Sequence, residues 1–434
     1  MPRTPDGQEC PSYGPARIGD RVGTGYLPRR LTLVLTPISD EASAMYDLLI
    51  RNGHVIDPAA SLDARRDVAV NGGRVAAILE PGTEARAIRT VDASGRYVVP
   101  GLIDFHVHVF PGVSHFGIEP DSTCLARGVT TVVDFGTAGG LIFDGFRRFV
   151  IDSSQTRVFA LLHIAGQGMI SSVGTLPALG ELHDLRYCSV ENVERVVAKH
   201  RDVICGIKIR CTANLAEGGR HESEGLALAR AAAERVSLPL VVHTPGSSLT
   251  IEQILAELKP GDVLTHCYHG KRCGLVDAER QLLPAVRDAL RNGVLLDVGH
   301  GVASFDIRVA RALLQQGILP DFISSDIHHY NVHGPVFDLV TTMDKFLHLG
   351  LSLRDVILRV TQTPARFLGR EHELGTLRPG AIADIAILEL QQGQFPLTDS
   401  EQHTEVARQR IEPTHVFRAG RQVGLLPRPE SLSI

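Results

Sequence analysis

The sequence predicts an α/β protein: a (β/α)8 TIM barrel joined to a small β-sandwich domain that is built from both ends of the chain. Short apolar runs alternate with longer segments of helical period, as strands and helices do in βα units with a parallel sheet. Eight such runs can be counted, which is the number of strands that closes this barrel. The 434 residues suffice for a barrel of about 250 residues and a smaller partner.

The expected domains follow from changes in the rhythm of the sequence. Short apolar runs broken by Gly, Asp and Pro predict one discontinuous β domain from residues 46–97 and 375–425, and residues 98–374 predict the barrel. Residues 1–44 predict a disordered extension, because an export signal would need a longer apolar region than Leu31–Leu35. Met45 offers an alternative start for the folded protein, which leaves open whether residues 1–44 belong to the native chain.

Strands and helices alternate through the predicted barrel. The expected strands are Val99–His108, Thr131–Asp134, Val158–His163, Ile204–Arg210, Leu240–His243, Val263–His266, Val294–His300 and Phe322–Asp326. The expected crossover helices include Glu191–His200, Gly225–Val236, Ile251–Leu258, Leu282–Arg291 and Val309–Gln316. Polar residues gather at or near the C-terminal ends of the strands, which form the catalytic face of such a barrel: His106, His108, Lys208, His243, His266 and Asp326.

Composition narrows the class of partner. A hydrophobic content of 44% and a charged content of 21% are typical of a soluble globular protein, and no apolar stretch approaches the about 20 residues that span a membrane. A net charge of -5 without Lys/Arg runs argues against nucleic acid and for a small-molecule partner. Seven cysteines without a CxxC pair predict no disulfide framework. Because disulfides are rare in the reducing cytoplasm, this pattern predicts a cytoplasmic location for the protein. A homo-oligomer stays open.

A candidate metal site begins in Asp104-Phe-His106-Val-His108. Alternate side chains of a strand share one face, so the two imidazoles can hold a single ion, although an HxH pair by itself is more often two ordinary strand histidines. Together with the preceding Val98-Val-Pro-Gly-Leu-Ile, this string resembles the first barrel strand of the amidohydrolase superfamily. The resemblance extends from about Tyr46 to Val423.

This resemblance implies a centre with two divalent metal ions. Lys208 falls where members with two metals carry a carboxylated lysine, which would serve as a bridging ligand. His243 and His266 match the histidines of the second metal, and Asp326 completes the ligand set at the eighth strand. Zinc is the expected metal, because Zn²⁺ accepts neutral nitrogen ligands readily, while Mn²⁺ is an alternative. A solvent-directed lysine, buried histidines and a helix-capping aspartate are the structural alternatives.

The implied chemistry is metal-assisted hydrolysis. A hydroxide that bridges the two metals would attack a carbonyl carbon, with Asp326 as the catalytic residue that takes up its proton and passes it to the leaving group. Arg210 lies two positions after Lys208 on the same strand face and could bind a substrate carboxylate. Tyr268 and His300 are expected in loops over the site as further substrate contacts, with structural roles as the alternative.

Several strings narrow the resemblance to amidohydrolase/deacetylase metallohydrolases: 128–134, 261–266, 296–301, 334–338 and 363–366. They imply a deacetylase-like enzyme that removes a small acyl group from an amide or ester. A cyclic amide hydrolase, similar to dihydroorotases and hydantoinases, is the alternative with the same chemistry. A mononuclear deaminase usually lacks the bridging lysine, and a non-catalytic scaffold loses ligands, whereas this chain has all six.

Overall fold

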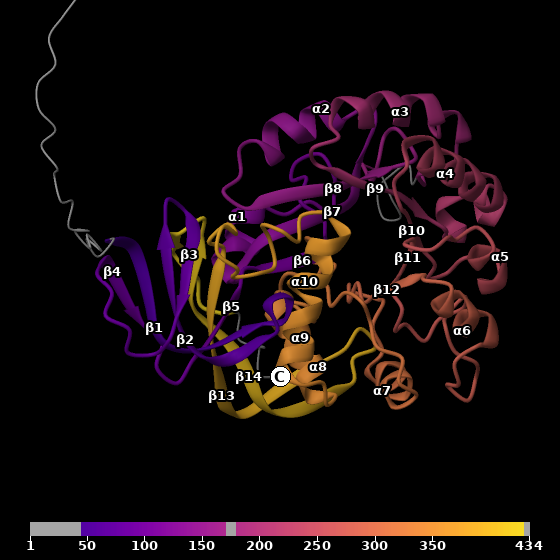
Figure 1. The fold of residues 1–434 in the computed structure, drawn as a ribbon. Coiled ribbons are helices and arrows are strands. Elements are labelled where there is room, and N and C mark those ends of the chain that lie inside the picture. Colours follow the sequence, from indigo (N-terminus) through magenta and orange to yellow (C-terminus); the bar gives the residue numbers. More distant parts are fainter. Residues whose placement is uncertain (1–44, 171–178, 429–434) are drawn as a thin grey trace, which may run out of the picture. The chain divides into compact units, whose positions relative to one another are not determined.

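The computed structural model describes residues 45–170 and 179–428. The predicted disordered extension, residues 1–44, lies outside these described residues. Figure 1 shows that strands from both ends of the chain, coloured indigo and yellow, share one sheet, whereas strands from the middle of the chain form a second sheet with helices along its outer side. None of the helices in the described ranges is both long and apolar enough to cross a bilayer.

The second sheet is the barrel sheet, and all its neighbouring strands are parallel. In the described residues it has seven strands that pair in sequence order, as successive βα units require. They are β6 (Leu102–Val107), β7 (Val129–Gly139), β8 (Arg157–His163), β9 (Ile204–Arg210), β10 (Leu240–His243), β11 (Val263–Thr265) and β12 (Leu295–Asp297). The predicted bounds of β9 and β10 are confirmed.

The expected eighth strand is an extended segment with only isolated pairing. Phe322 forms a parallel bridge to Asp297 of β12, and Ile327 forms one to Val107 of β6. The backbone N–H of Asp326 donates to the carbonyl of His106 at 2.7 Å. The segment 322–327 therefore closes the barrel, but it departs from a regular strand because Asp326 has a left-handed φ of 49°.

The helices follow the strands and lie along the outside of the barrel sheet in Figure 1. In the described ranges they are α1 (Pro120–Thr123), α2 (Phe143–Phe146), α3 (Val190–Lys199), α4 (Glu222–Val236), α5 (Ile251–Leu255), α6 (Pro284–Arg291), α7 (Ile307–Gln315), α8 (Leu339–His348), α9 (Leu353–Arg359) and α10 (Gln362–Phe367). The five helices expected from the sequence are α3 to α7. Their ends differ from prediction by up to three residues, as helix ends commonly do.

The small domain is one mixed sheet of eight strands in the described residues, rather than a sandwich of two separately paired sheets. Its strands are β1 (Tyr46–Asp57), β2 (Leu62–Asn71), β3 (Arg74–Leu79), β4 (Ala87–Asp92), β5 (Tyr97–Pro100), β13 (Ile385–Thr398), β14 (Thr404–Arg418) and β15 (Arg421–Val423). Alternate residues bury opposite faces: Val98 and Ile385 lie in the core of the small domain, whereas Val99 and Ala386 lie in the core shared with the barrel.

The expected strand Val99–His108 is divided between the two sheets. β5 ends at Pro100 in the mixed sheet, and β6 begins at Leu102 in the barrel. At Gly101 a Cβ atom would lie 2.3 Å from Thr130 Oγ1 and 2.7 Å from Asp384 Cβ. The chain therefore passes between the sheets at a point where only glycine fits.

Asp384 joins the barrel to the mixed sheet. Its buried carboxylate accepts hydrogen bonds from Arg157 of β8, from Arg418 of β14 at 3.3 Å and from the N–H of Ala419 at 2.7 Å. Both arginines are mostly buried, with 14% and 23% of their side-chain surface exposed. One carboxylate thus compensates two cations between the two sheets.

We expect Asp384→Ala to lower the free energy of unfolding by about 3 kcal/mol, because it leaves two mostly buried guanidinium groups without their counter-charge. Midpoints of urea unfolding for the wild type and the variant measure this loss. Asp152→Ala is the control, since the Asp152 side chain pairs with Arg147 but is 53% exposed, and its effect should be much smaller. Equal midpoints for the two variants would contradict the linking role of Asp384.

Candidate metal centre

One cavity at the C-terminal ends of the barrel strands brings the six predicted ligands together. Its volume is about 150 Å³. It is lined by His106, His108, Lys208, Arg210, His243, His266 and Asp326, together with Phe116, Met169, Val302, Ala303, Ser304 and His328. Barrel closure therefore gathers side chains that lie far apart in the sequence.

His106, His108 and Asp326 form the tightest group in this cavity. The Nε2 atoms of the two histidines lie 3.3 Å and 3.1 Å from Oδ1 of Asp326. Their other ring nitrogens are held by neighbours: Nδ1 of His106 lies 2.9 Å from Asp297 Oδ2, and Nδ1 of His108 lies 2.8 Å from Thr137 Oγ1. Proteins commonly orient metal-binding histidines in this way. The three residues could therefore bind one metal ion together.

His266 and His243 lie beside this group. The ring centre of His266 is 5.1 Å from that of His106 and 4.5 Å from that of His243. Nδ1 of His266 donates to the carbonyl of Gly299 at 2.7 Å, so its Nε2 atom keeps a free lone pair. Gly299 has a φ of 46°, and a Cβ atom there would lie 2.8 Å from Nδ1 of both His106 and His266. Glycine is required at this position for the two rings to keep their places.

Lys208 is a buried amine with no carboxylate in contact. The residue is 1% exposed, and its Nζ atom has no hydrogen-bond partner among the described residues. Nζ lies 4.6 Å from the centre of the Phe135 ring. Burial lowers the pKa of Lys208 to about 7, which favours the neutral amine. A neutral, unpaired amine beside the histidines fits a lysine that is carboxylated to become a ligand.

The electrostatics of the cavity suit a divalent cation. Burial raises the pKa of Asp326 to about 6 and that of Asp297 to about 7. Burial also holds the pKa values of His106 and His266 well below 6.5. Both rings are therefore neutral, and a ring nitrogen of each can donate its electron pair to a metal ion. His266 and Asp326 have left-handed φ values of 65° and 49°, which are uncommon outside glycine and typical of functional sites.

Tyr268 and His300 are not brought to this cavity. Tyr268 is fully buried, and its hydroxyl donates to the carbonyl of Ile318 at 3.1 Å. His300 stacks on Phe305, and its Nε2 atom lies 2.6 Å from Nζ of Lys345. Both side chains are buried outside the cavity, whose lining includes neither of them. Their expected role as substrate contacts is not supported by this placement.

Two buried residues near the ligands were not singled out from the sequence. His163 ends β8 opposite Lys208 in the strand register, and its Nε2 atom has no hydrogen-bond partner among the described residues. Asp297 ends β12 and holds Nδ1 of His106. A polar residue at the end of a predicted strand is a signal that could have identified His163, whereas Asp297 lies inside the predicted strand Val294–His300 and only the observed end of β12 reveals it.

Comparison with known proteins places this geometry in a family. The profile of the amidohydrolase family matches residues 97–423. A relative from Agrobacterium fabrum that is named a deacetylase is 31% identical over 350 residues, which cover 80% of this chain and 84% of the relative. The crystal structure of an adenine deaminase is similar with a TM-score of 0.80 and 32% identity, covering 87% of this chain and 99% of that chain. The crystal structure of a dihydroorotase gives 0.78 and 28%, with the same coverage.

We expect the affinity of the metal-free protein for Zn²⁺ to fall as the pH drops below about 7 and to fall more steeply below about 6. The sign follows from burial, which raises the pKa values of Asp297 and Asp326, so both carboxyls become neutral over this range and stop attracting a cation. Competition with a chromophoric chelator at pH 5, 6, 7 and 8 measures the affinity. In Asp326→Asn the affinity should be lower, and the additional fall below pH 6 should disappear. An affinity that is constant from pH 5 to pH 8 in the wild type would contradict this account.

Proposed function

Because the chain belongs to the amidohydrolase family and has a metal site of His106, His108 and Asp326, we propose that it removes a small acyl group from an amide or ester, as a deacetylase does. The observation that carries the proposal is the set of relatives named deacetylases, which match at 31% to 33% identity over most of their length. The cavity supports an enzyme over a non-catalytic scaffold, because burying these polar groups together costs free energy that a scaffold function does not explain.

The proposed centre holds two divalent ions, and zinc is the metal that these ligands favour. His106, His108 and Asp326 would hold the first ion, and His243 and His266 would hold the second. Lys208, carboxylated at its unpaired Nζ atom, would bridge the two ions. The support for this bridge is the burial of Lys208 in the same cavity as the histidines with no hydrogen-bond partner for its Nζ atom among the described residues, which makes the unmodified amine costly to bury.

The bound ions would supply Lewis acidity and lower the pKa of a water molecule. Asp326 then moves the proton. Its Oδ1 atom has no hydrogen-bond partner among the described residues, and burial raises its pKa to about 6, close to the working range of a general base and acid. Asp326 would take a proton from the attacking water and return it to the leaving nitrogen or oxygen. The same proton transfer would assist the hydrolysis of an amide or of an ester.

Arg210 would select substrates that bear a carboxylate. Its side chain lines the cavity next to the ligands, with the guanidinium group 5.7 Å from the centre of the Phe116 ring. Its Nε atom lies 3.7 Å from the buried carboxylate of Glu181, which would hold the arginine in place. A guanidinium group fixed in this way can form two parallel hydrogen bonds to a carboxylate. The cavity of about 150 Å³ favours a compact substrate.

Two other reactions are alternatives for the same centre. Similarity to a dihydroorotase structure keeps hydrolysis of a cyclic amide open, and similarity to an adenine deaminase structure keeps deamination open. Lys208 favours a binuclear hydrolase over a mononuclear deaminase, because a single ion needs no bridging ligand. The metal content and the substrate preference separate these possibilities.

We expect about two metal ions per chain in protein purified without chelator and with added bicarbonate. Lys208→Met should lose one ion and nearly all hydrolase activity, because the bridging ligand is gone. Elemental analysis counts the ions, and NMR with ¹³C-labelled bicarbonate detects the carbamate. Lys345→Met is the matched control, since Lys345 is also fully buried but lies outside the cavity, and it should keep both ions. One ion in the wild type, or full activity of Lys208→Met, would favour the deaminase alternative.

We expect the wild type to hydrolyse N-acetyl amino acids or O-acetyl α-hydroxy acids faster than their neutral methyl esters, cyclic ureides, lactones or adenine. Arg210→Met should lower kcat/KM for the carboxylate substrates about 10- to 100-fold through lost charge-assisted hydrogen bonds, and it should affect neutral substrates little. Arg220→Met is the control, because the Arg220 side chain is 77% exposed. Equal losses for charged and neutral substrates would refute carboxylate recognition, and a preference for cyclic ureides would refute the deacetylase proposal.

A further inference from the structure

A second pocket lies at the opposite end of the barrel from the metal centre. Its volume is about 530 Å³, compared with about 150 Å³ for the metal-centre cavity. Its lining includes Pro239, Asp262, Leu295 and Phe322, which lie at or just before the N-terminal ends of β10, β11, β12 and the closing segment. His243, His266 and Asp326 lie at the opposite, C-terminal ends of β10, β11 and the closing segment, and the linings of the two cavities share no residue, so the cavities are separate.

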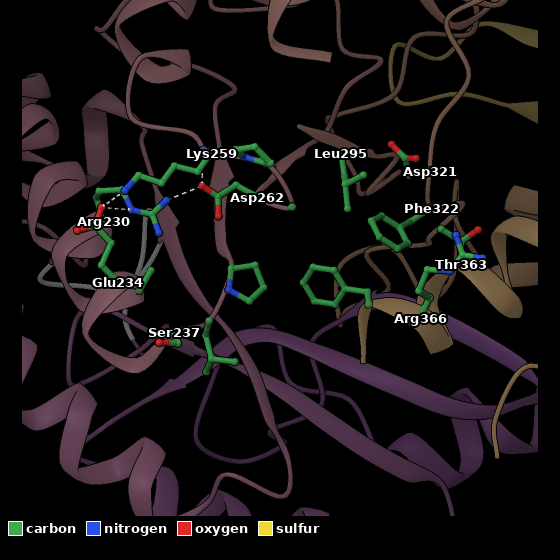
Figure 2. Close-up of a pocket in the computed structure, with 16 residues that line it drawn as sticks. Arg230, Glu234, Ser237, Lys259, Asp262, Leu295, Asp321, Phe322, Thr363 and Arg366 are labelled. Atoms are coloured by element: carbon green, nitrogen blue, oxygen red, sulfur yellow. Dashed lines mark hydrogen bonds and ion pairs between the residues drawn. The ribbon is translucent and has the colours of Figure 1, made fainter. Parts of the chain in front are cut away.

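The pocket has an apolar, partly aromatic interior. Leu295, Phe322, Phe367 and Pro239 contribute apolar surface to its lining. In Figure 2 the side chains of Leu295 and Phe322 lie between a charged group around Arg230 on one side and Thr363 and Arg366 on the other. The volume and the apolar lining are those of sites for small molecules, which combine a mostly apolar wall with a few polar groups.

Most charges around this pocket are already paired. Arg230 contacts Asp262 and lies 3.3 Å from Glu234, and Nζ of Lys259 lies 2.6 Å from the same Glu234, as the dashed lines of Figure 2 indicate. The carboxylate of Asp321 accepts the backbone N–H of Leu296 at 2.8 Å. These groups satisfy one another without a ligand.

Arg366 is the exception among the charged side chains of the lining. In the described part of the chain its guanidinium group has neither an ion pair nor a hydrogen bond. It belongs to α10, the same helix that carries Phe367 of the pocket wall. Arg366 is exposed to solvent, so the pocket offers one cation without a protein partner at its open side, next to aromatic surface. This arrangement complements a ligand with one negative charge and an apolar ring.

We propose that this pocket is a second ligand site, which binds a compact aromatic monocarboxylate with its ring against Phe322 and Phe367 and its carboxylate on Arg366. The ring gains contact with two aromatic side chains, and the single charge matches the one unpaired guanidinium group. A dianion would find no second free cation in the lining, because Arg230 and Lys259 are paired. The inference rests on the pocket alone and stands apart from the proposed reaction.

Calorimetric titration of the metal-loaded full chain tests the site, with phenylacetate as the probe and neutral phenylacetamide as its isosteric control. We expect saturable binding of one phenylacetate per chain and at least tenfold weaker binding of phenylacetamide. Arg366→Gln should weaken phenylacetate binding about tenfold and leave phenylacetamide unchanged. Arg291→Gln removes an arginine that is 72% exposed and outside the pocket lining, and it should bind both probes as the wild type does.

Two further variants place the probe and keep the test decisive. Phe367→Leu should weaken the binding of both probes, because it removes ring contact without removing charge. Arg210→Met should retain phenylacetate binding, because Arg210, the proposed carboxylate contact, lies in the other cavity; loss of binding in this variant would place the probe in the metal centre and overturn the proposal. The absence of saturable binding to the wild type, or equal binding by a folded Arg366→Gln variant, would overturn it as well. Circular dichroism of each variant verifies folding.

Discussion

Closure of the barrel between its first and last segments is the constraint on which the metal centre depends. The backbone N–H of Asp326 donates to the carbonyl of His106 at 2.7 Å, and the N–H of Ser325 donates to the buried carboxylate of Asp104 at 3.0 Å. These bonds fix a segment that has only isolated strand pairing. They place the Asp326 carboxylate within 3.3 Å of the Nε2 atoms of His106 and His108. Without closure, residues far apart in the sequence would not share a cavity.

The centre gathers polar groups that water would otherwise solvate. Lys208 and Asp326 are buried, and each has an atom without a hydrogen-bond partner in the described residues. Burying such groups costs free energy, and the unpaired lysine adds repulsion to the neighbouring histidines when it is protonated. The surrounding barrel core makes this cost tolerable. Such unsatisfied, buried polar groups are typical of active sites, which often trade stability for function.

The closing segment also connects the two ends of the barrel. Phe322 begins it and lines the second pocket, while Asp326 lies at the metal centre. Between them the Phe322 ring stacks on Phe105 at a centroid distance of 3.8 Å, and Phe105 contacts Phe135 at 5.3 Å. The Phe135 ring in turn stacks on the ring of His106, which lines the metal-centre cavity, at a centroid distance of 3.7 Å. An aromatic layer therefore separates the two cavities and packs against both.

The sequence by itself determined the parts that depend on local pattern. Alternating apolar runs predicted the parallel barrel and the bounds of β9 and β10, and the pattern of polar residues at or near strand ends picked out six side chains that line one cavity. Only the tertiary structure divided residues 99–108 at Gly101, buried Tyr268 and His300 outside the cavity, and placed Asp297 behind His106. The physical reason is that periodicity reports which residues face a core. The direction of a loop after its strand ends, and the partner of a buried polar group, are decided by packing between distant segments.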